Sequence, residues 1–275
     1  MKPGLPTAAL GNEVRKGLLY AWSERLQILI ELPMFALFIL LLGPLLGQGE
    51  HIPTGTVSWS IDSERTSVLV VWIIPFIFFY MQVIKMFWRL LGEIQTGTIE
   101  QVYLSPLPSW LVAAAGRATA ALLETIVVAG ATYGIVSVFV PLHIGWRLTA
   151  LVPAALIMVT AIGVSLMVAG ATLVWKRIQL VNDTVLLIVF IFSAAAIPLI
   201  TVPGWWIDVG RVFPLTNGVA SLYRVLFLDQ PVTSPWGTGG LVWLVVTAAA
   251  YPAAGILAFR LGERTAKRRG TLGRY

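Results

Sequence analysis

The sequence predicts an all-α polytopic membrane protein with six transmembrane helices and with its N- and C-termini in the cytoplasm. Three observations predict this fold class: the composition, the lengths of the apolar segments, and the distribution of lysine and arginine. Of the 275 residues, 57% are hydrophobic and only 12% are charged, whereas soluble domains carry roughly 25% charged residues. The composition therefore indicates a membrane protein rather than a soluble domain.

Six segments of the chain are long and apolar enough to cross a bilayer, which takes about 20 mostly apolar residues. They are residues 27–47, 67–88, 111–140, 149–174, 183–202 and 239–260. None shows the strict alternation of a barrel strand, so each is expected to be a helix. The chain thus divides into a cytoplasmic segment 1–26, a six-helix transmembrane domain 27–260 and a basic cytoplasmic tail 261–275.

The orientation of the helices follows from the basic side chains, because lysine and arginine are enriched in cytoplasmic loops. With the N-terminus inside, fourteen of the nineteen Lys and Arg residues fall in cytoplasmic segments and four in outer loops, while Arg117 lies within the third apolar segment. This bias predicts that both termini are cytoplasmic.

The N-terminal segment reads as an amphipathic helix. Val14, Leu18 and Trp22 recur at every fourth residue, which places them on one side of a helix. Such a helix can lie in the membrane interface, with its tryptophan at headgroup depth. The alternative is a cytosolic extension of the first span.

Several function classes find little support in the composition. The chain has no cysteine, so disulfides and thiol chemistry are excluded. Its two histidines, His51 and His143, lie far apart and give no metal-ligand spacing. The net charge of +6 marks the cytoplasmic side, and no basic patch interleaves with aromatic residues as nucleic-acid sites require. No nucleic-acid partner is therefore expected.

The polar stretch "GEIQTGTIEQVYLSPLP" (92–108) separates the second and third apolar segments. Gly97 weakens a continuous helix, Thr98 with Gln101 forms a capping-box pattern that starts a new one, and Pro106 ends it, since the residue before proline is pushed out of the helical region. The expected short helix carries an apolar face of Ile99, Val102, Tyr103 and Leu104.

An apolar face on a cytoplasmic helix needs a cover, either lipid or another protein, and we favour a protein. The alternative is an ordinary solvated loop, but a turn between two spans needs far fewer residues.

This stretch resembles the E–x₃–G-T-[LI]-E–x₄–S-P signature of ABC-2-type transporter permeases. The matching residues are Glu93, Gly97, Thr98, Ile99, Glu100, Ser105 and Pro106. A second stretch, "FPLTNGVASLYRVLF" (213–227), is similar to the N-P-L-T…R segment before the last span of that family. Pro214, Leu215 and Thr216 match, whereas Phe213 stands where Asn is usual and Arg224 falls one position late.

The resemblance implies a coupling helix that docks on a separate cytoplasmic ABC ATPase, with two ATPase copies and a second permease subunit completing the exporter. The residues it assigns to coupling are Glu93, Gly97, Thr98, Ile99, Glu100, Val102, Tyr103, Leu104, Ser105 and Pro106. The chain has no phosphate-binding loop of the G-x-x-x-x-G-K-[ST] type, so this subunit is not expected to be an enzyme. No cofactor is expected on it; ATP and Mg would be used by the partner. The implied location is the inner (plasma) membrane of a prokaryote.

The outer connection 203–238 is expected to form short re-entrant helices that line or cap the exit, with Trp205, Trp206 and Trp236 at the aromatic belt. Pro214, Leu215, Thr216 and Arg224 belong to this segment. The alternative is a surface loop resting on lipid.

Three ionisable residues touch the apolar segments. Glu31 is expected at the interface, and Arg117 at the inner boundary of the third segment. Glu124 lies about 10 Å deeper, at 1.5 Å per residue, too far from Arg117 for a direct salt bridge. The pair either lines the translocation path or dimer interface, or is structural and binds polar groups of another span. Small-residue pairs Gly43/Gly47 and Gly130/Gly134 permit close helix contacts.

The expected function is the permease subunit of an ABC exporter for an amphiphilic or hydrophobic substrate, such as a drug, lipid or glycolipid. One alternative is a secondary transporter, which needs ion relays within the membrane. The other is a membrane-embedded enzyme, which needs clustered reactive side chains that the sequence does not display.

Overall fold

The structure is a computed structural model that describes residues 5–47, 62–99, 107–175, 178–197, 199, 202–232 and 240–270. Every regular element within these ranges is helical, as the sequence predicts. The α-helices are α1 (Leu5–Ser23), α2 (Arg25–Gly47), α3 (Ser63–Gln95), α5 (Ser109–Phe139), α6 (Leu151–Val174), α7 (Gln179–Ser193), α8 (Gly204–Gly210), α9 (Pro214–Phe227) and α10 (Leu241–Arg269). Two short 3₁₀ helices, η1 (Leu148–Ala150) and η2 (Ala194–Ala196), precede α6 and follow α7.

Five helices are long and apolar enough to cross a bilayer, as expected of a multi-pass membrane protein. They cover Arg25–Gly43, Ser63–Gln95, Ser109–Phe139, Leu148–Val174 and Leu241–Arg269. The expected fifth span, 183–202, is occupied by α7, whose 15 residues extend only about 22 Å at 1.5 Å per residue. The hydrocarbon core is about 30 Å thick, so α7 is shorter than a spanning helix. Among the described residues, five of the six expected spans are therefore long enough to cross.

Helix ends follow from local chemistry. The Asp62 side chain caps α3 by accepting a hydrogen bond from the Glu64 amide at 2.9 Å, the usual role of aspartate at an N-cap. The same helix ends at Gln95, and Gly97 follows with a φ of +72°, which glycine adopts without strain. The predicted break at Gly97 is therefore confirmed. Helix α10 continues to Arg269, so residues 261–269, expected in the basic tail, are its last turns.

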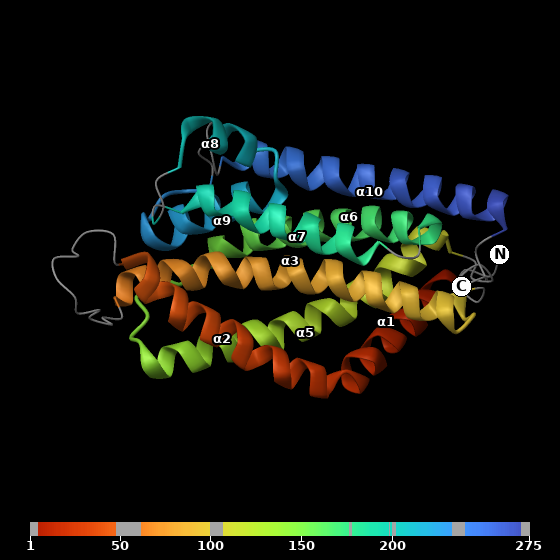
Figure 1. Cartoon of the computed structure of the whole chain (residues 1–275), viewed down its shortest axis with the longest axis horizontal. Helices are drawn as coiled ribbons and strands as arrows, with labels where there is room; N and C mark the ends of the chain where they lie inside the picture. Colours follow the sequence, from red (N-terminus) through yellow and green to blue (C-terminus); the bar gives the residue numbers. More distant parts are fainter. Residues whose placement is uncertain are drawn as a thin grey trace.

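Helix α3 lies at the centre of the bundle, as Figure 1 shows, with α6, α9 and α10 along one side and α1, α2 and α5 along the other. Helix α1 and the C-terminal end of α10 lie toward the same end of the molecule, whereas α8 and α9 lie toward the opposite end.

Helices α6 and α10 meet backbone to backbone at four glycines: Gly163 and Gly170 on α6, Gly255 and Gly262 on α10. A Cβ on Gly163 would lie 2.7 Å from the Tyr251 carbonyl oxygen, and one on Gly170 would lie 2.6 Å from the Ala258 carbonyl oxygen. Both distances are below van der Waals contact, so no larger residue fits without separating the helices.

The glycines singled out by their G-x-x-x-G spacing are not the ones at this crossing. A Cβ on Gly130 or on Gly134 would meet no atom within 4 Å. Their spacing permits a close contact with another helix, but neither glycine makes one within the part of the chain that the structure describes.

Helix α1 presents apolar side chains outward, as an interfacial helix would. Leu18 and Trp22 are 46% and 69% exposed. Its other face lies on α5, where a Cβ on Gly116 would come within 2.6 Å of the Glu13 carbonyl oxygen. The close approach at this glycine brings the polar residues of α1 against the bundle.

Candidate functional site

Three charged residues form a buried stripe on the last third of α3. Lys85, Arg89 and Glu93 are spaced by four residues, so they lie one above another on the same face of the helix. Their exposures are 2%, 5% and 3%. Burial of charge is costly unless each ion is paired, so the arrangement of their partners is the central feature of this end of the bundle.

The partners come from three other helices or their junctions, and together with the stripe they form what we call the ion network. Its members are Lys16, Glu24, Glu31, Lys85, Arg89, Glu93, Arg117 and Glu124. Four are acids and four are bases, so the ion network has no net charge when all are ionised.

One half of the ion network surrounds Arg89 and Lys85. Arg89 donates to Glu124 of α5 and, through the same nitrogen at 2.9 Å, to Glu24, which lies between α1 and α2. Lys85 donates to Glu24 at 3.1 Å and lies 3.7 Å from a carboxylate oxygen of Glu31 and of Glu124. This half therefore ties α3 to α5 and to the start of α2.

The other half surrounds Glu93. Its carboxylate accepts a hydrogen bond from Lys16 of α1 at 2.8 Å and another from Arg117 of α5. Arg117 also donates to the Ala113 carbonyl at 2.8 Å. Glu93 thus joins three helices through charge-assisted hydrogen bonds, which are roughly twice as strong as neutral ones.

The ring of Tyr20 lies between the two halves. The Lys16 ammonium is 5.8 Å and the Arg89 guanidinium carbon 5.7 Å from its centroid, within the range of cation–π attraction. Burial is the main reason that the pKa of the Tyr20 hydroxyl lies above its ordinary value. The neutral ring therefore serves as a packing surface for both cations.

On α3 the ion network lies near one end of the helix, whereas Glu124 is at the middle of α5. Helix α3 has 33 residues and is about 50 Å long at 1.5 Å per residue, well over the roughly 30 Å of a bilayer core. The stripe occupies its final third, on the side of the chain termini. That excess length allows the charged residues to lie at the membrane boundary.

Protonation of Glu24 and protonation of Glu13 change the stability of the fold in opposite directions. Burial alone would raise the pKa of Glu24, but Arg89, through its hydrogen bond and charge, and Lys85 hold this pKa below its ordinary value of 4.5. Burial raises the pKa of Glu13 above 4.5. Ionised Glu24 therefore stabilises the fold above about pH 4.5, and this contribution is lost as the pH falls through its folded-state pKa. The contribution of Glu13 is present below 4.5 and is lost as the pH rises.

We expect the Glu24→Gln variant to lose less thermal stability than the wild type when detergent-solubilised protein is taken from about pH 5 to pH 3, because it lacks the carboxylate that must be protonated. The matched variant Glu13→Gln should lose more than the wild type, since it lacks the group that favours the folded state on acidification. Melting temperatures measured across this range test both signs. Parallel curves for the three proteins would contradict the assignment.

The membrane-embedded residues named from the sequence all fall in or beside the ion network. Arg117 and Glu124 do not pair with each other, as predicted, but each binds a charged residue of α3. This is the arrangement expected if the two are structural. Glu31, expected at the interface, is only 13% exposed in its side chain and approaches Lys85 instead.

Sequence reasoning missed the roles of Lys16, Glu24, Lys85 and Arg89. The signal was present, because a Lys–Arg–Glu stripe at four-residue spacing on an apolar helix needs buried partners. Lys16, Lys85 and Arg89 entered the sequence analysis only as basic charges that set orientation, and Glu24 only as a polar residue of the N-terminal segment.

The ABC-2-like motif begins at Glu93, the last residue of the stripe. Glu93 is buried, so it could act on a partner protein only indirectly. Thr98 is exposed and its hydroxyl lies 3.0 Å from that of Thr96, whereas Ile99 is 2% exposed and belongs to the core. The remaining motif residues, Glu100, Val102, Tyr103, Leu104, Ser105 and Pro106, lie outside the described residues.

The outer motif residues belong to α9, which is embedded in the bundle among α3, α6, α7 and α10. Pro214 is its first residue, Leu215 and Thr216 are fully buried, and Arg224 is partly exposed in its last turn. The Thr216 hydroxyl donates to the Phe192 carbonyl at 3.3 Å. A surface loop at 214–227 is therefore wrong, and the expected short helices are confirmed.

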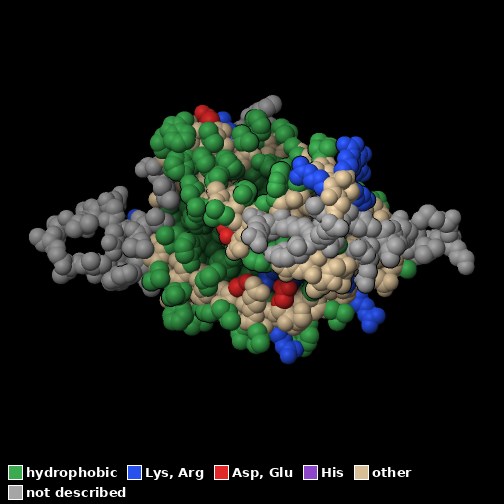
Figure 2. Space-filling model, turned by 45° about the vertical axis from the view of Figure 1, so that its right-hand side comes forward, with side chains coloured by type: hydrophobic (Ala, Val, Ile, Leu, Met, Phe, Trp, Pro, Cys, Tyr) green, Lys and Arg blue, Asp and Glu red, His purple; other side chains and the backbone are tan. Residues whose placement is uncertain are grey.

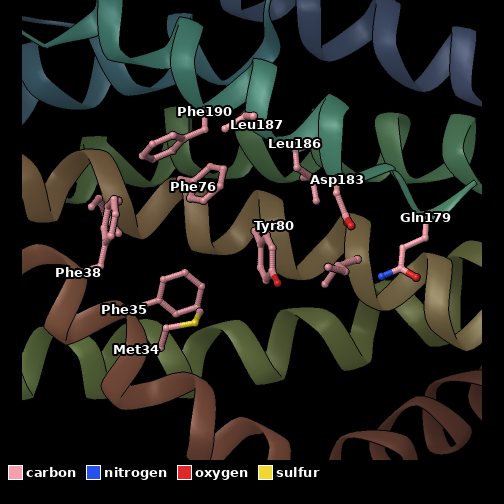
Figure 3. Close-up of a pocket in the computed structure, with 12 residues that line it drawn as sticks. Met34, Phe35, Phe38, Phe76, Tyr80, Gln179, Asp183, Leu186, Leu187 and Phe190 are labelled. Carbon is pink, nitrogen blue, oxygen red and sulfur yellow. The ribbon is translucent and has the colours of Figure 1, made fainter. Parts of the chain in front are cut away.

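A lateral pocket of about 550 Å³ opens between α2, α3 and α7. Figure 3 shows the aromatic rings of Phe35, Phe38, Phe76 and Phe190 toward one end, and Asp183 and Gln179 toward the other. Phe76 and Phe190 are 4.6 Å apart between ring centroids, and Tyr80 lies 5.9 Å edge-to-face from Phe35. The polar end is nearer the chain termini, because α7 begins there at Gln179. The pocket therefore has an apolar part and a polar end with one acid.

The surface of the bundle also has an apolar part and a charged end. On the face shown in Figure 2, hydrophobic side chains are concentrated on the left-hand part, and the largest group of Lys and Arg side chains lies at the upper right. The last turn of α10 carries Lys267, Arg268 and Arg269. Basic residues at the end that holds the termini are what a cytoplasmic end would show.

Within the described ranges, no group of three or more His, Asp or Glu side chains could hold a metal ion. The fold and the site define the class of this chain as an α-helical multi-pass membrane protein with a buried ion network and a lateral pocket. No known family model matches the chain, and no curated protein is significantly similar to it.

Proposed function

We propose that the chain is the membrane-spanning permease subunit of an ATP-driven ABC exporter. The observation that carries the proposal is the ABC-2-like motif at the end of α3, which begins at Glu93 of the ion network. The chain leaves α3 at Gln95, turns at Gly97 and enters α5 at Ser109. The motif thus joins the two helices that the ion network holds together.

This arrangement supports a mechanical role for the segment. Glu93 with Arg117, and Arg89 with Glu124, link α3 to α5 at two levels. A force applied to the connection between these helices by a partner ATPase would move α3 and α5 as one body. Lys16 and Glu24 extend the links to α1 and α2, so the interfacial helix would follow.

The proposed exporter contains two copies of a cytoplasmic ABC ATPase, which use ATP and Mg, and a second permease subunit, identical or a sister. In this proposal each permease chain spans the inner membrane of a prokaryote six times, with α7 as the fifth span and both termini inside. Helices α8 and α9 are then outer re-entrant helices. Backbone at membrane depth is tolerated where protein covers it, and the burial of α9 supports this placement.

The lateral pocket supports an amphiphilic substrate such as a drug, lipid or glycolipid. Its aromatic part suits an apolar body, while Tyr80, Gln179 and Asp183 offer hydrogen-bonding groups at the other end. The substrate would leave the cytoplasm or inner leaflet when ATP-driven closure changes the affinity of this pocket.

The proposal is tested by reconstituting the chain in vesicles with an ABC ATPase that co-purifies with it and following a fluorescent amphiphile. Transport should require ATP hydrolysis and should persist when ion gradients are collapsed. Val102→Asp should abolish both co-purification of the ATPase and transport, since it would bury an unpaired charge at the contact. The control Gln95→Asp, at an exposed position of the same end, should retain both.

A secondary transporter is the second candidate, because the ion network, with Glu124 at the middle of α5, provides ionisable groups that a proton relay would need. It predicts transport that follows an ion gradient without ATP. That result in the same vesicles would replace the ABC proposal.

The proposed topology is tested by single cysteines, which the cysteine-free chain accepts without background. Thr98→Cys and His143→Cys both lie at exposed positions, one at each end of the bundle. A membrane-impermeant maleimide should label His143→Cys in intact cells and Thr98→Cys only after permeabilisation. Labelling of Thr98→Cys in intact cells would rule out docking of a cytoplasmic ATPase at the motif.

A further inference from the structure

A second lateral groove opens on the opposite side of α3 from the pocket described above. It has a volume of about 360 Å³ and lies between α3, α5, α6 and α9. Its lining is apolar apart from the end at Arg147 and from Thr125, whose hydroxyl is already engaged with the Ala121 carbonyl at 2.6 Å. Apolar cavities of this kind do not hold water, so the groove suits a hydrocarbon chain.

The size of the groove fits part of one acyl chain. If each methylene takes about the 30 Å³ that a water molecule takes in the liquid, the volume accommodates roughly a dozen carbons. Ile126 and Leu151 at its rim are 60% and 64% exposed, so the groove is open sideways. A chain could therefore enter from the bilayer without crossing the protein.

Polar groups gather at one end of the groove, the end away from the chain termini. Arg147, just before η1, forms an ion pair with Asp229, just after α9. Both are accessible, with side-chain exposures of 49% and 67%, and the neighbouring Trp146 is 65% exposed. Exposed tryptophan and arginine at the end of spanning helices mark the headgroup region.

The two charges lie side by side, which favours a headgroup that carries both signs. A phosphate can bind the guanidinium, whose fork of five donors is not exhausted by one carboxylate. A primary ammonium can donate hydrogen bonds to Asp229. A quaternary ammonium has no proton to donate, and an anionic headgroup would bring further negative charge to Asp229. The headgroup that carries both a phosphate and a primary ammonium is phosphoethanolamine.

We propose that this groove is a lipid site that binds an acyl chain of a phosphoethanolamine phospholipid, with the phosphate on Arg147 and the ammonium on Asp229. The occupant comes from the leaflet at the end of the bundle away from the termini. The site does not depend on the transport function proposed above, because it uses a different face of α3.

The test is native mass spectrometry of the full chain, purified in detergent, stripped of lipid and given an equal mixture of phosphatidylethanolamine, phosphatidylcholine and phosphatidylglycerol with identical acyl chains. The wild type should retain the ethanolamine lipid roughly five- to tenfold better than the others, the ratio expected from one charge-assisted contact. Asp229→Asn should abolish this preference. Arg147→Gln should lower retention of all three lipids.

A matched pair of variants tests the groove itself. Ala154 lines it, whereas Ala155, the next residue of α6, is exposed outside it. Ala154→Phe should lower retention of the ethanolamine lipid roughly tenfold by filling the groove, and Ala155→Phe should not change it. Equal retention in these two variants would overturn the site. A wild-type preference for phosphatidylglycerol would overturn the headgroup assignment, and melting curves confirm that each variant is folded.

Discussion

Replacement of Glu124 by alanine is expected to lower the free energy of unfolding by about 3–5 kcal/mol, the cost of removing one partner from a buried ion pair. Arg89 would keep Glu24, and Lys85 would keep Glu24 and Glu31, but the charge on α5 that faces them would be gone. The Glu124 side chain is fully buried. Thermal unfolding of the solubilised protein measures the loss.

Glu31→Ala is the matched control, because Glu31 lies 3.7 Å from the same Lys85 ammonium but is at the edge of the ion network. Its loss should cost less than the loss of Glu124, because Glu31 lies beyond hydrogen-bond distance of Lys85, whereas Glu124 also accepts a hydrogen bond from Arg89. Transport is measured in parallel. If Glu124→Ala melts like the wild type but no longer transports substrate, Glu124 lines the path and is not structural.

A second large effect is expected at the α6–α10 crossing. Gly163→Ala would place a Cβ 2.7 Å from the Tyr251 carbonyl oxygen and in contact with the Pro252 backbone. Backbone atoms in two long helices cannot move aside locally, so the helices must separate and lose contacts along their length. We expect a loss of at least about 3 kcal/mol, the upper part of the range for overpacking, seen as a fall in the yield of monodisperse protein.

The control for this substitution is Gly130→Ala on α5, where a Cβ would meet no atom within 4 Å. Alanine is a better helix former than glycine by about 0.8–1 kcal/mol, so this variant should be as stable as the wild type or slightly more stable. If the two variants gave the same yield, the close approach of α6 and α10 would not be what holds them together.

Hydropathy predicted most of the fold because the length of an apolar segment is a local property. Three expected spans, 27–47, 111–140 and 149–174, match helices closely, whereas 67–88 lies within the longer α3, Ser63–Gln95, which ends two residues before Gly97. The fifth differs because α7 ends at Ser193 although the sequence remains apolar beyond it. Hydropathy reports which residues tolerate lipid, and it does not report where the backbone leaves the helix.

The candidate site was less accessible to sequence reasoning because its partners are distant in the chain. Lys16 and Glu93 are 77 residues apart, and nothing local to either predicts the contact. The crossing glycines show the same difficulty. Gly163 and Gly170 repeat at seven residues, as do Gly255 and Gly262, but only the pairing of α6 with α10 distinguishes them from Gly130 and Gly134.

The α6–α10 crossing also decides which parts of the bundle can rearrange. At the four glycines the backbones of α6 and α10 meet directly, so the helices cannot slide or rotate against each other without breaking these contacts. The two helices are therefore expected to move as one rigid unit. Any opening of the bundle must then occur at other helix contacts, where long side chains can change rotamer. We expect the aromatic contacts that line the pocket between α2, α3 and α7 to be where such a rearrangement occurs.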